Sequence, residues 1–407
     1  MNLKLKASSR MLSSSIQITG SKSETNRLLL LQALYPLIEV ENISESDDAD
    51  AMIKALNSTE SVIDVHHAGT AMRFLTAFFA VHGNREILLT GSSRMKERPI
   101  GILVDALREL GAKIEYAEKE GYPPLRIGKF EITNNKISLK ADVSSQYITA
   151  LLLVAPKLKN GIEITLQDKI TSLPYINMTL GLLAEVGIDA QMTGNVIKVS
   201  PLGEMNPVKV VVESDWSSAS YFYSLIALAE EGSQIELSSY RQGSLQGDSA
   251  LVDIYKFLGV ETTFSNDSIV LRKTSLRPKV VNLDLNNTPD IAQTIAVTCL
   301  GLGIGCKLTG LHTLKIKETD RLEALRVELT KLGAGVIITE DSLELQPVLQ
   351  INHNIEIDTY NDHRMAMAFA PLAIKVPIVI NDAQVVSKSY PAFWDDFKKT
   401  GFIVETL

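Results

Sequence analysis

The chain has 407 residues, too many for one ordinary hydrophobic core, so we expect two or three domains. Hydrophobic residues make up 45% and charged residues 22%, which is typical of a folded globular protein and excludes a disordered one. The net charge of −8 argues against a nucleic-acid-binding protein. Any anionic ligand must therefore be held by cations gathered in one place.

The N-terminal residues and the two cysteines bear on the compartment. Residues 1–11 carry three cations and no apolar core, so we do not expect a signal peptide. No apolar run approaches the roughly 18 residues that span a bilayer. Cys299 and Cys306 are too few for a disulfide framework. We therefore expect a cytoplasmic protein that binds neither a membrane nor a nucleic acid.

The first element of interest is residues 20–27, with the sequence GSKSETNR. They precede the uncharged run 28–38, which predicts a buried helix, and Ser21 and Glu24 have the spacing of a capping box. A helix N-terminus attracts anions, and Lys22 and Arg27 would strengthen that attraction. The stretch is equally consistent with an anion site and with a purely structural helix start.

The same kind of helix recurs along the chain. Apolar helices with polar starts are predicted to begin near residues 23, 70, 144, 217, 290 and 363, at spacings of 47, 74, 73, 73 and 73 residues. A β-rich run follows each one. In five of the six repeats an amphipathic helix closed by glycine and a strand or hairpin come next. The closing glycines are Gly111, Gly187, Gly259, Gly333 and Gly401.

The repeat predicts an α/β fold of six β-α-β-α-β-β units, the first of them truncated because its interval is short. Three units per domain give a normal domain size, so two compact domains are favoured over a solenoid. We expect one domain at 20–213 and the other at 1–19 and 214–407. The strand predicted at residues 2–7 would complete the C-terminal half.

Charged residues gather at several of the predicted helix starts. The cluster around Arg98 and the cluster 317–321 could each be an ordinary solvated loop or salt-bridge network. Lys317 and Arg321 have i,i+4 spacing, which would place both cations on one helix face. Asp290 has N-capping as its simplest role, whereas Arg364 enters an apolar run, where a charge is costly without a partner. Lys388 is uninformative alone.

Two carboxylates among many cations suit proton transfer on a phosphorylated, carboxylated substrate. The carboxylates are Asp290 and Glu318. The histidines are scattered, which gives no indication of a metal site, and the glycine-rich phosphate loops of nucleotide-binding proteins are absent.

At these residues the chain resembles the 5-enolpyruvylshikimate-3-phosphate synthase family, an enolpyruvyl transferase family of the shikimate pathway. The resemblance is carried by GSKSETNRLLL (20–30), AGTAMR (68–73), RMKERPIG (94–101), SSQYITALLL (144–153), SLPYINMTL (172–180), SSASYF (217–222), PDIAQTIA (289–296), KETDRL (317–322) and YNDHRMAM (360–367). It implies two domains of three repeats, an inside-out α/β barrel fold, which close over the substrates. It also implies enolpyruvyl transfer from phosphoenolpyruvate to the 5-hydroxyl of shikimate 3-phosphate, through a tetrahedral intermediate, by a monomer with no cofactor and no metal.

The resemblance also implies site residues. Those for shikimate 3-phosphate are Lys22, Ser23, Arg27, Ser144, Ser145, Gln146, Ser172, Tyr175, Asp290 and Lys317. Those for phosphoenolpyruvate are Lys22, Gly69, Arg98, Gln146, Arg321, Arg364 and Lys388. Asp290 would be the base, and Glu318 with Lys22 would relay the proton at C3.

The chain departs from the family pattern at three positions. Thr313 stands where the family often has an asparagine on the shikimate phosphate, and His67 and Phe74 flank Gly69 where asparagine and proline are usual. Gly69 is the residue associated with sensitivity to glyphosate, the inhibitor of this family. We expect His67 and Phe74 to reshape the phosphoenolpyruvate pocket.

Two other functions remain open. The UDP-N-acetylglucosamine enolpyruvyl transferases share the architecture, but they typically use a loop cysteine as acid, and the loop around Arg94–Pro99 has none. A non-catalytic anion-binding protein of the same fold would gain nothing from Asp290 and Glu318.

Overall fold

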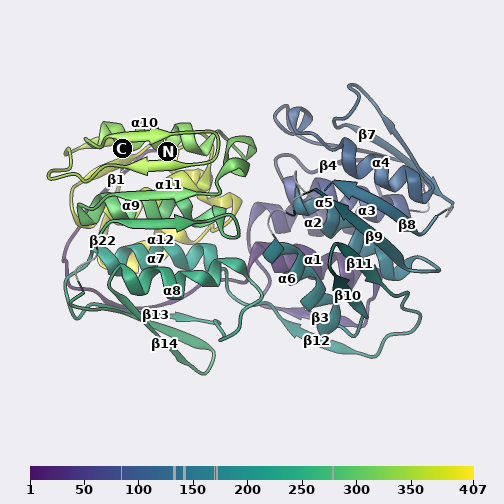
Figure 1. The fold of residues 1–407 in the computed structure, drawn as a ribbon, viewed down its shortest axis with the longest axis horizontal. Coiled ribbons are helices and arrows are strands. Elements are labelled where there is room, and N and C mark those ends of the chain that lie inside the picture. Colours follow the sequence, from purple (N-terminus) through teal and green to yellow (C-terminus); the bar gives the residue numbers. More distant parts are fainter. Residues whose placement is uncertain (84, 132–133, 141–143, 169, 171–172, 277–278) are drawn as a thin grey trace. The chain divides into compact units, whose positions relative to one another are not determined.

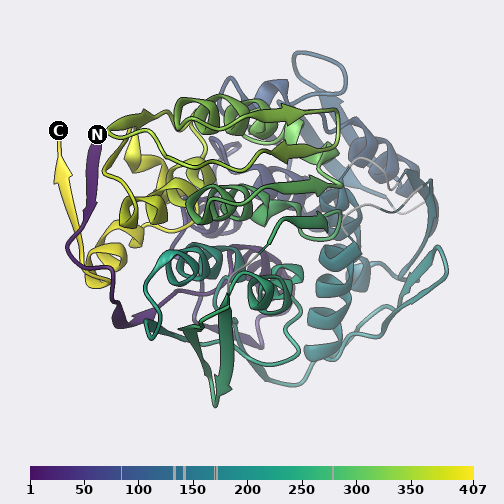
Figure 2. The ribbon, with the colours of Figure 1, turned by 60° about the vertical axis from the view of Figure 1, so that its left-hand side comes forward.

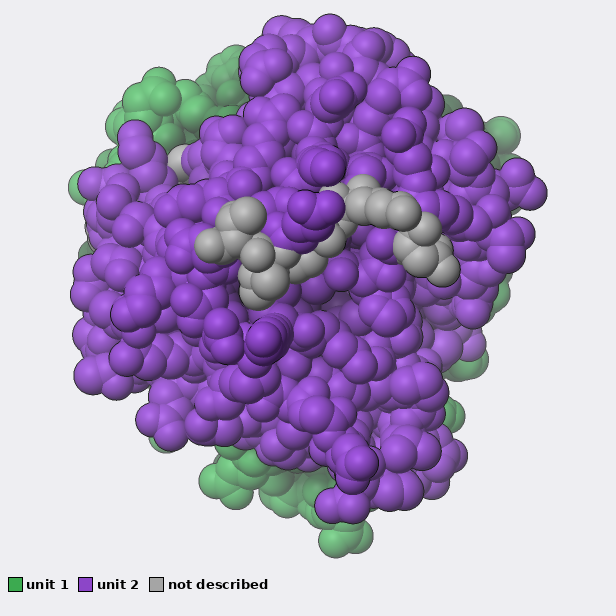
Figure 3. Space-filling view, turned by 90° about the vertical axis from the view of Figure 1, so that its right-hand side faces the viewer, with its two compact units in different colours: residues 1–19, 213–407 green, residues 20–212 purple. Residues whose placement is uncertain are grey.

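The computed structural model describes residues 1–83, 85–131, 134–140, 144–168, 170, 173–276 and 279–407. These residues cluster into two compact units (Figures 1 and 3). Unit 1 comprises Met1–Thr19 and Glu213–Leu407, and unit 2 comprises Gly20–Val212.

Each unit holds six of the α-helices found in the described ranges, alternately buried and amphipathic. In unit 2 these are α1 (Lys22–Leu34), α2 (Asp47–Leu56), α3 (Gly69–His82), α4 (Gly101–Leu110), α5 (Ser145–Val154) and α6 (Leu173–Glu185). In unit 1 they are α7 (Trp216–Leu228), α8 (Leu251–Phe257), α9 (Ala292–Leu302), α10 (Arg321–Lys331), α11 (His363–Phe369) and α12 (Phe393–Lys399).

The odd-numbered helices start at or within two residues of the predicted positions and form the core of each unit. In α7 every residue except Ser217 is buried, and all seven residues of α11 are buried. Helices α7, α9 and α11 contact one another in unit 1, and α1, α3 and α5 do so in unit 2. A helix that is apolar on every side can only be stable inside such a core. The prediction of six buried helices is therefore confirmed.

Four-stranded sheets cover these cores and share one strand pattern. In four of these sheets the strand before a buried helix pairs in parallel with the strand after it, and in four an antiparallel hairpin extends the sheet. The β14–β15 hairpin turns at Asn266, which has a φ of 52°. The sheets are β4-β5-β7-β6 and β10-β11-β9-β8 in unit 2, and β14-β15-β13-β2, β16-β17-β19-β18 and β20-β21-β1-β22 in unit 1.

The strands run as follows along the chain, and β3, β5, β9, β13, β17 and β21 fall in the six β-rich runs predicted after the buried helices. They are β1 (Leu3–Ala7), β2 (Ser13–Gln17), β3 (Ile38–Glu41), β4 (Val62–Asp64), β5 (Ile87–Thr90), β6 (Ala112–Tyr116), β7 (Leu125–Phe130), β8 (Lys136–Lys140), β9 (Ile162–Gln167), β10 (Ala190–Thr193), β11 (Val196–Val199), β12 (Val208–Val211), β13 (Gln234–Ser238), β14 (Val260–Ser265), β15 (Ser268–Lys273), β16 (Val281–Asp284), β17 (Cys306–Thr309), β18 (Val336–Ile338), β19 (Leu343–Leu345), β20 (Ile355–Ile357), β21 (Ile378–Ile380) and β22 (Phe402–Thr406).

The first and last repeats differ from the rest in the way the sequence predicts. The first repeat has only the two-stranded sheet β12-β3, since no hairpin follows α2. The last repeat has its hairpin position filled by the two ends of the chain. Strand β1 lies between β21 and β22, antiparallel to both, so the termini lie side by side (Figure 2).

The two strands that lead from one unit to the other each pair within the unit that the chain is leaving. Strand β2 precedes α1 of unit 2 but pairs with β13 of unit 1. Strand β12 precedes α7 of unit 1 but pairs with β3 of unit 2. The repeat pattern did not predict the pairing partners of these two strands.

The helix ends follow the predicted glycine chemistry, but one predicted cap is wrong. Gly111, at the end of α4, has a φ of 114°, in the left-handed region that favours glycine. Ser21 is the N-cap of α1, yet its side chain makes no capping hydrogen bond. Gly20, the residue before it, lies so close to the backbone oxygen of Asn42 that no side chain would fit at this position. No helix of the described ranges is long and apolar enough to cross a membrane.

Strand β1 provides a test of the fold. Leu5 is fully buried at the centre of a sheet, whereas the neighbouring Lys4 is exposed. We expect Leu5→Ala to lower the free energy of unfolding by about 2–5 kcal/mol through the cavity it leaves, and Lys4→Ala to change it by less than about 0.5 kcal/mol. Urea unfolding followed by circular dichroism measures both. Equal losses in the two variants would contradict this burial.

Candidate active site

The centre of the unit 1 site is the buried guanidinium of Arg321, which is 1% exposed. It donates to three carboxylates: Nη1 to Asp290 Oδ1 at 2.9 Å, Nη2 to Glu318 Oε2 at 2.8 Å and Nε to Asp362 Oδ2 at 2.6 Å. Burial opposes the charged form, but Asp362, Glu318 and Asp290 together raise the pKa of Arg321 above its ordinary value. Arg321 is therefore a permanent cation that holds the predicted acid and base in fixed places.

The starts of the three buried helices meet beside this cation. Arg364, in the first turn of α11, donates from Nη1 to the backbone oxygen of Asp290 at 3.0 Å and from Nη2 to Ser217 Oγ at 3.3 Å. Ser217 lies in the first turn of α7, and Asp290 lies in the 3₁₀ turn Pro289–Ile291 before α9. These contacts show that the starts of α7, α9 and α11 lie together within unit 1. They also give the Arg364 charge the partners that its burial requires.

Asp290 is a hub for cations rather than a helix cap. Besides Arg321, its carboxylate is 3.7 Å from Lys317 Nζ and 3.5 Å from Arg364 Nη2. The predicted N-capping role is therefore wrong, since Thr288 is the N-cap of that turn. The predicted shared helix face of Lys317 and Arg321 is also wrong, because α10 begins only at Arg321. The two cations nevertheless meet at one oxygen of Asp290.

Two further residues of the predicted set lie in unit 1. Glu318 has 28% of its side chain exposed, so it is open to solvent on one side while Arg321 holds the other. Lys388 Nζ donates to the backbone oxygen of Asn361 at 2.7 Å, which ties it to the loop before α11.

Arg27 is the buried cation of unit 2. It is 3% exposed and donates to hydroxyl and carbonyl oxygens: Nε to Thr179 Oγ1 at 2.9 Å and Nη1 to the backbone oxygen of Ser23 at 2.7 Å. Its guanidinium also lies 5.9 Å from the ring centre of Tyr175. Burial lowers the pKa of Arg27 to about 10, so it stays charged at neutral pH and a nearby anion would stabilise it.

Lys22 and Ser23 form the first turn of α1. Lys22 Nζ is 4.0 Å from the carboxylate of Asp48, a buried residue of α2. The ammonium is thus oriented by an acid that the sequence analysis did not identify. The side chains of Lys22 and Ser23 are half-buried, which leaves them within reach of a ligand.

The starts of α3 and α5 meet in unit 2 as their counterparts do in unit 1. Gln146 Nε2 donates to Thr70 Oγ1 at 3.3 Å, and Ser144 caps α5 by accepting from the backbone nitrogen of Gln146. Ser145 is buried beside them. Ser172, the remaining predicted residue, lies outside the described residues.

Gly69 and Arg98 lie in contact. A Cβ on Gly69 would stand 2.4 Å from Arg98 Nη1, so glycine leaves the space that the guanidinium occupies. Behind them, the buried Arg73 donates to the backbone oxygen of Pro99 at 2.9 Å. Burial and then the nearby Arg98 lower the pKa of Arg73 to about 10. Two cations held this close favour the binding of an anion.

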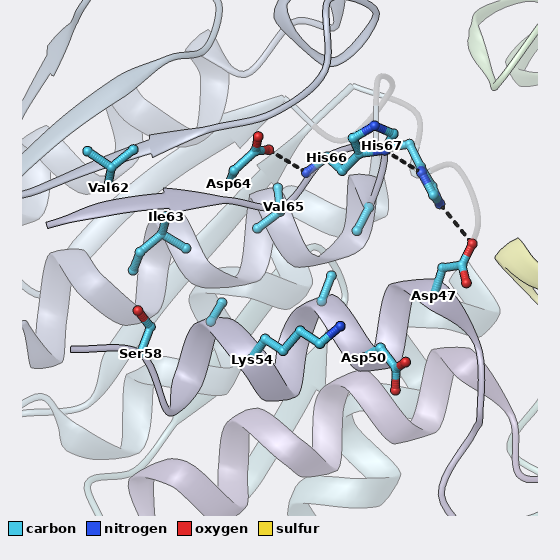
Figure 4. Close-up of a pocket in the computed structure, with 13 residues that line it drawn as sticks. Asp47, Asp50, Lys54, Ser58, Val62, Ile63, Asp64, Val65, His66 and His67 are labelled. Carbon is cyan, nitrogen blue, oxygen red and sulfur yellow. Dashed lines mark hydrogen bonds and ion pairs between the residues drawn. The ribbon is translucent and has the colours of Figure 1, made fainter. Parts of the chain in front are cut away.

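A pocket of about 380 Å³ lies near the start of α3 but is lined by none of the predicted site residues. Figure 4 shows the side chains that line it, which come from α2, from Ser58, from β4 and from the segment between β4 and α3. His67 Nε2 is 3.5 Å from Asp47 Oδ2, and His66 Nδ1 lies 2.8 Å from His67 Nδ1. The pocket belongs to the truncated repeat and its neighbour. In the described ranges no group of three or more His, Cys, Asp or Glu side chains is arranged to hold a metal ion.

The three departures from the family pattern have different surroundings. Thr313 Oγ1 is buried without a hydrogen-bond partner among the described residues. Phe74 is fully buried, with its ring centre 5.6 Å from the Arg27 guanidinium. His67 lies close to the carboxylate of Asp47, and both residues line the pocket. His67 belongs to the loop that precedes Gly69.

Comparison with known proteins identifies the family. The family model described as EPSP synthase (3-phosphoshikimate 1-carboxyvinyltransferase) matches residues 55–397. A protein of Bacteroides fragilis named 3-phosphoshikimate 1-carboxyvinyltransferase is 46% identical over 396 residues, which cover 95% of each chain. The chain belongs to the EPSP synthase family.

Other members of the family and its fold relatives agree with this placement. A protein of Shewanella halifaxensis with the same name is 38% identical, over 95% of this chain and 96% of its own. The solved EPSP synthase of Acinetobacter baumannii superposes with a TM-score of 0.82 over 100% of both chains at 20% identity, which shows the fold. The enolpyruvyl transferase NikO of Streptomyces tendae gives 0.75 at 13% identity, covering 99% of this chain and 98% of its own.

The residues that sequence reasoning missed are the partners of the predicted ones. Ser217 and Asp362 lie inside the matched motifs SSASYF (217–222) and YNDHRMAM (360–367) but were given no role, and Asp48 lies in another element, outside every matched motif. Asp362 stands in YNDHR beside Arg364, and the cost of burying Arg321 was the available signal that an acid had to be near.

Asp362 gives a test of this ion cluster. It is fully buried, and it both accepts from Arg321 and caps α11 through the backbone nitrogen of Arg364 at 2.9 Å. We expect Asp362→Ala to destabilise the protein by about 3–5 kcal/mol, because a buried cation loses a partner. The control is Asp358→Ala, which breaks the exposed pair with Lys331 and should cost at most about 1 kcal/mol. Chemical denaturation that finds equal costs would refute the role of Asp362.

Proposed function

We propose that this chain transfers the enolpyruvyl group of phosphoenolpyruvate to the 5-hydroxyl of shikimate 3-phosphate and releases phosphate. Membership of the EPSP synthase family supplies the reaction. One structural observation supports it most strongly. A buried carboxylate, Asp290, contacts three cations and shares Arg321 with a half-exposed acid, Glu318. That grouping places cations beside two groups for proton transfer.

The proposed substrate contacts come from residues of both units. In unit 2, Lys22, Ser23, Arg27, Ser144, Ser145, Gln146, Ser172 and Tyr175 would bind shikimate 3-phosphate, while Lys22, Gly69, Arg98 and Gln146 would bind phosphoenolpyruvate. In unit 1, Asp290 and Lys317 would bind shikimate 3-phosphate, and Arg321, Arg364 and Lys388 phosphoenolpyruvate. Arginines suit these partners because a guanidinium binds carboxylate or phosphate through two parallel hydrogen bonds.

Asp290 is the proposed base. The 5-hydroxyl oxygen adds to C2 of phosphoenolpyruvate while its proton passes to Asp290, and C3 receives a proton from Glu318 or Lys22. An anion that pairs with Arg321 and Arg364 weakens their hold on Asp290, which leaves the carboxylate freer to accept a proton. The tetrahedral intermediate then loses phosphate from C2 as C3 returns its proton to Glu318 or Lys22.

We also propose that the chain acts as a monomer in the cytoplasm, without a nucleic acid or a membrane. The net charge of −8 supports the absence of nucleic-acid and membrane binding, because it disfavours association with both kinds of polyanionic surface. The alternative with UDP-N-acetylglucosamine as acceptor is less well supported, since the similar curated proteins carry the shikimate name.

The first test is a phosphate-release assay with both substrates. We expect release only when shikimate 3-phosphate and phosphoenolpyruvate are both present, and none when either is omitted. UDP-N-acetylglucosamine in place of shikimate 3-phosphate serves as the control acceptor. Turnover with that acceptor and not with shikimate 3-phosphate would overturn the assignment.

The second test addresses Asp290. Asp290→Asn keeps the shape of the side chain and removes the base, so we expect kcat to fall at least about 100-fold while calorimetric affinity for shikimate 3-phosphate changes by less than about fivefold. Asp253→Asn, at an exposed acid of α8, is the control and should match the wild type. Loss of affinity in proportion to kcat would assign Asp290 to binding alone.

A further inference from the structure

A second buried carboxyl group, Asp248, lies behind the unit 1 site and has no part in the mechanism above. It belongs to the 3₁₀ turn Gly247–Ala250 that precedes α8, and it is 7% exposed. Its Oδ2 accepts a short hydrogen bond from Ser217 Oγ. The same Ser217 oxygen accepts from Arg364 Nη2 at 3.3 Å. Asp248, Ser217 and Arg364 therefore form a continuous chain of contacts that ends at Asp290.

A second side chain, Gln246, joins the segment that carries Asp248 to the start of α7 through hydrogen bonds. Gln246 Oε1 accepts from the backbone nitrogen of Trp216 at 2.9 Å. Gln246 Nε2 donates to the backbone oxygen of Ser214 at 3.0 Å. Gln246 and Asp248 thus hold the turn against the residues on both sides of Asp215. The Asp248 carboxyl is fixed by its own loop, so it can act as an anchor for Ser217.

The chemistry of a hydroxyl group explains what the anchor does. Ser217 has one hydrogen to donate and lone pairs to accept with. When the hydrogen points at Asp248, the lone pairs are left to face the Arg364 guanidinium. Without Asp248 the hydroxyl can rotate, and its dipole no longer favours the observed place of Nη2. Burying the Asp248 carboxyl group is costly, and the hydrogen bond from Ser217 offsets part of that cost.

The charge of Asp248 is also suited to this position. Burial first, and then the nearby Asp290, raise the pKa of Asp248 to about 7, while Arg364 and the hydrogen bond from Ser217 act in the opposite direction. Asp215 is the other acid that acts on it. A carboxyl group that is neutral in part of the molecules competes less with an anionic substrate for Arg364 than a full negative charge would.

We propose that Asp248 is a positioning residue which, through Ser217, holds the guanidinium of Arg364 where the anion of phosphoenolpyruvate binds. The proposal rests on the proposed function, because it assigns Arg364 to that substrate. It predicts that the effect of Asp248 is seen in the KM for phosphoenolpyruvate and not in the KM for shikimate 3-phosphate.

The test is a double-mutant cycle on Asp248 and Ser217. We expect Asp248→Ala and Ser217→Ala each to raise the KM for phosphoenolpyruvate about tenfold, with kcat and the other KM within about twofold. The double variant should be no worse than either single one, because both break the same chain. Asp248→Asn, whose amide oxygen can still accept from Ser217, should stay within about threefold of the wild type. Asp253→Asn on the adjoining helix is the matched surface control.

The outcomes separate this proposal from a structural role and from the proposed function. Additive effects of the two alanine substitutions, or equal rises in both KM values, would overturn it. If Asp248→Ala does not fold, Ser217→Ala and Asp248→Asn decide the question, and a normal KM for phosphoenolpyruvate in Ser217→Ala overturns it. A wild-type enzyme without turnover on the two substrates refutes the proposed function itself.

Discussion

Each unit buries three helices on all sides, and this constraint decides where polar chemistry can occur. A buried helix keeps its interior backbone groups paired, but its first turn has N–H groups that need partners. Polar side chains are stable there and costly elsewhere along the helix. Ser217, Asp290 and Arg364 all come from such first turns or the residues just before them, and they contact one another. The 73-residue spacing of the repeat is thus also the spacing of the site.

The two units meet the cost of buried cations in different ways. In unit 1, Arg321 is surrounded by Asp290, Glu318 and Asp362, so its charge is balanced before any ligand arrives. In unit 2, Arg27 and Arg73 donate to hydroxyl and carbonyl oxygens, and burial lowers the pKa of each to about 10. The buried cations of unit 2 therefore gain more from a bound anion than Arg321 does.

The repeat spacing predicted the fold well because each repeat buries one apolar helix, and such a helix can be recognised from the sequence alone. The six helix starts, the truncation of the first repeat and the place of β1 were all accessible in this way. The side-chain partners were not. Ser21 has the spacing of a cap but does not cap α1, and Lys317 precedes the helix that its i,i+4 spacing suggested. Asp362 and Asp248 act on residues 41 and 31 positions away in the sequence, where no local pattern reaches.

Strand β2 pairs within unit 1 and strand β12 pairs within unit 2, and the first and last residues of unit 2 lie next to each other. A Cβ on Gly20 would lie 2.8 Å from Val212 Cγ1, and Asn42 Nδ2 donates to the Val212 oxygen at 2.8 Å. In unit 1, Ser214 Oγ donates to the Ile18 oxygen at 2.5 Å. Residues 20–212 thus have the connectivity of an inserted domain, which begins and ends at one point of its host. A chain joined directly from Ile18 to Ser214 would keep every strand of unit 1.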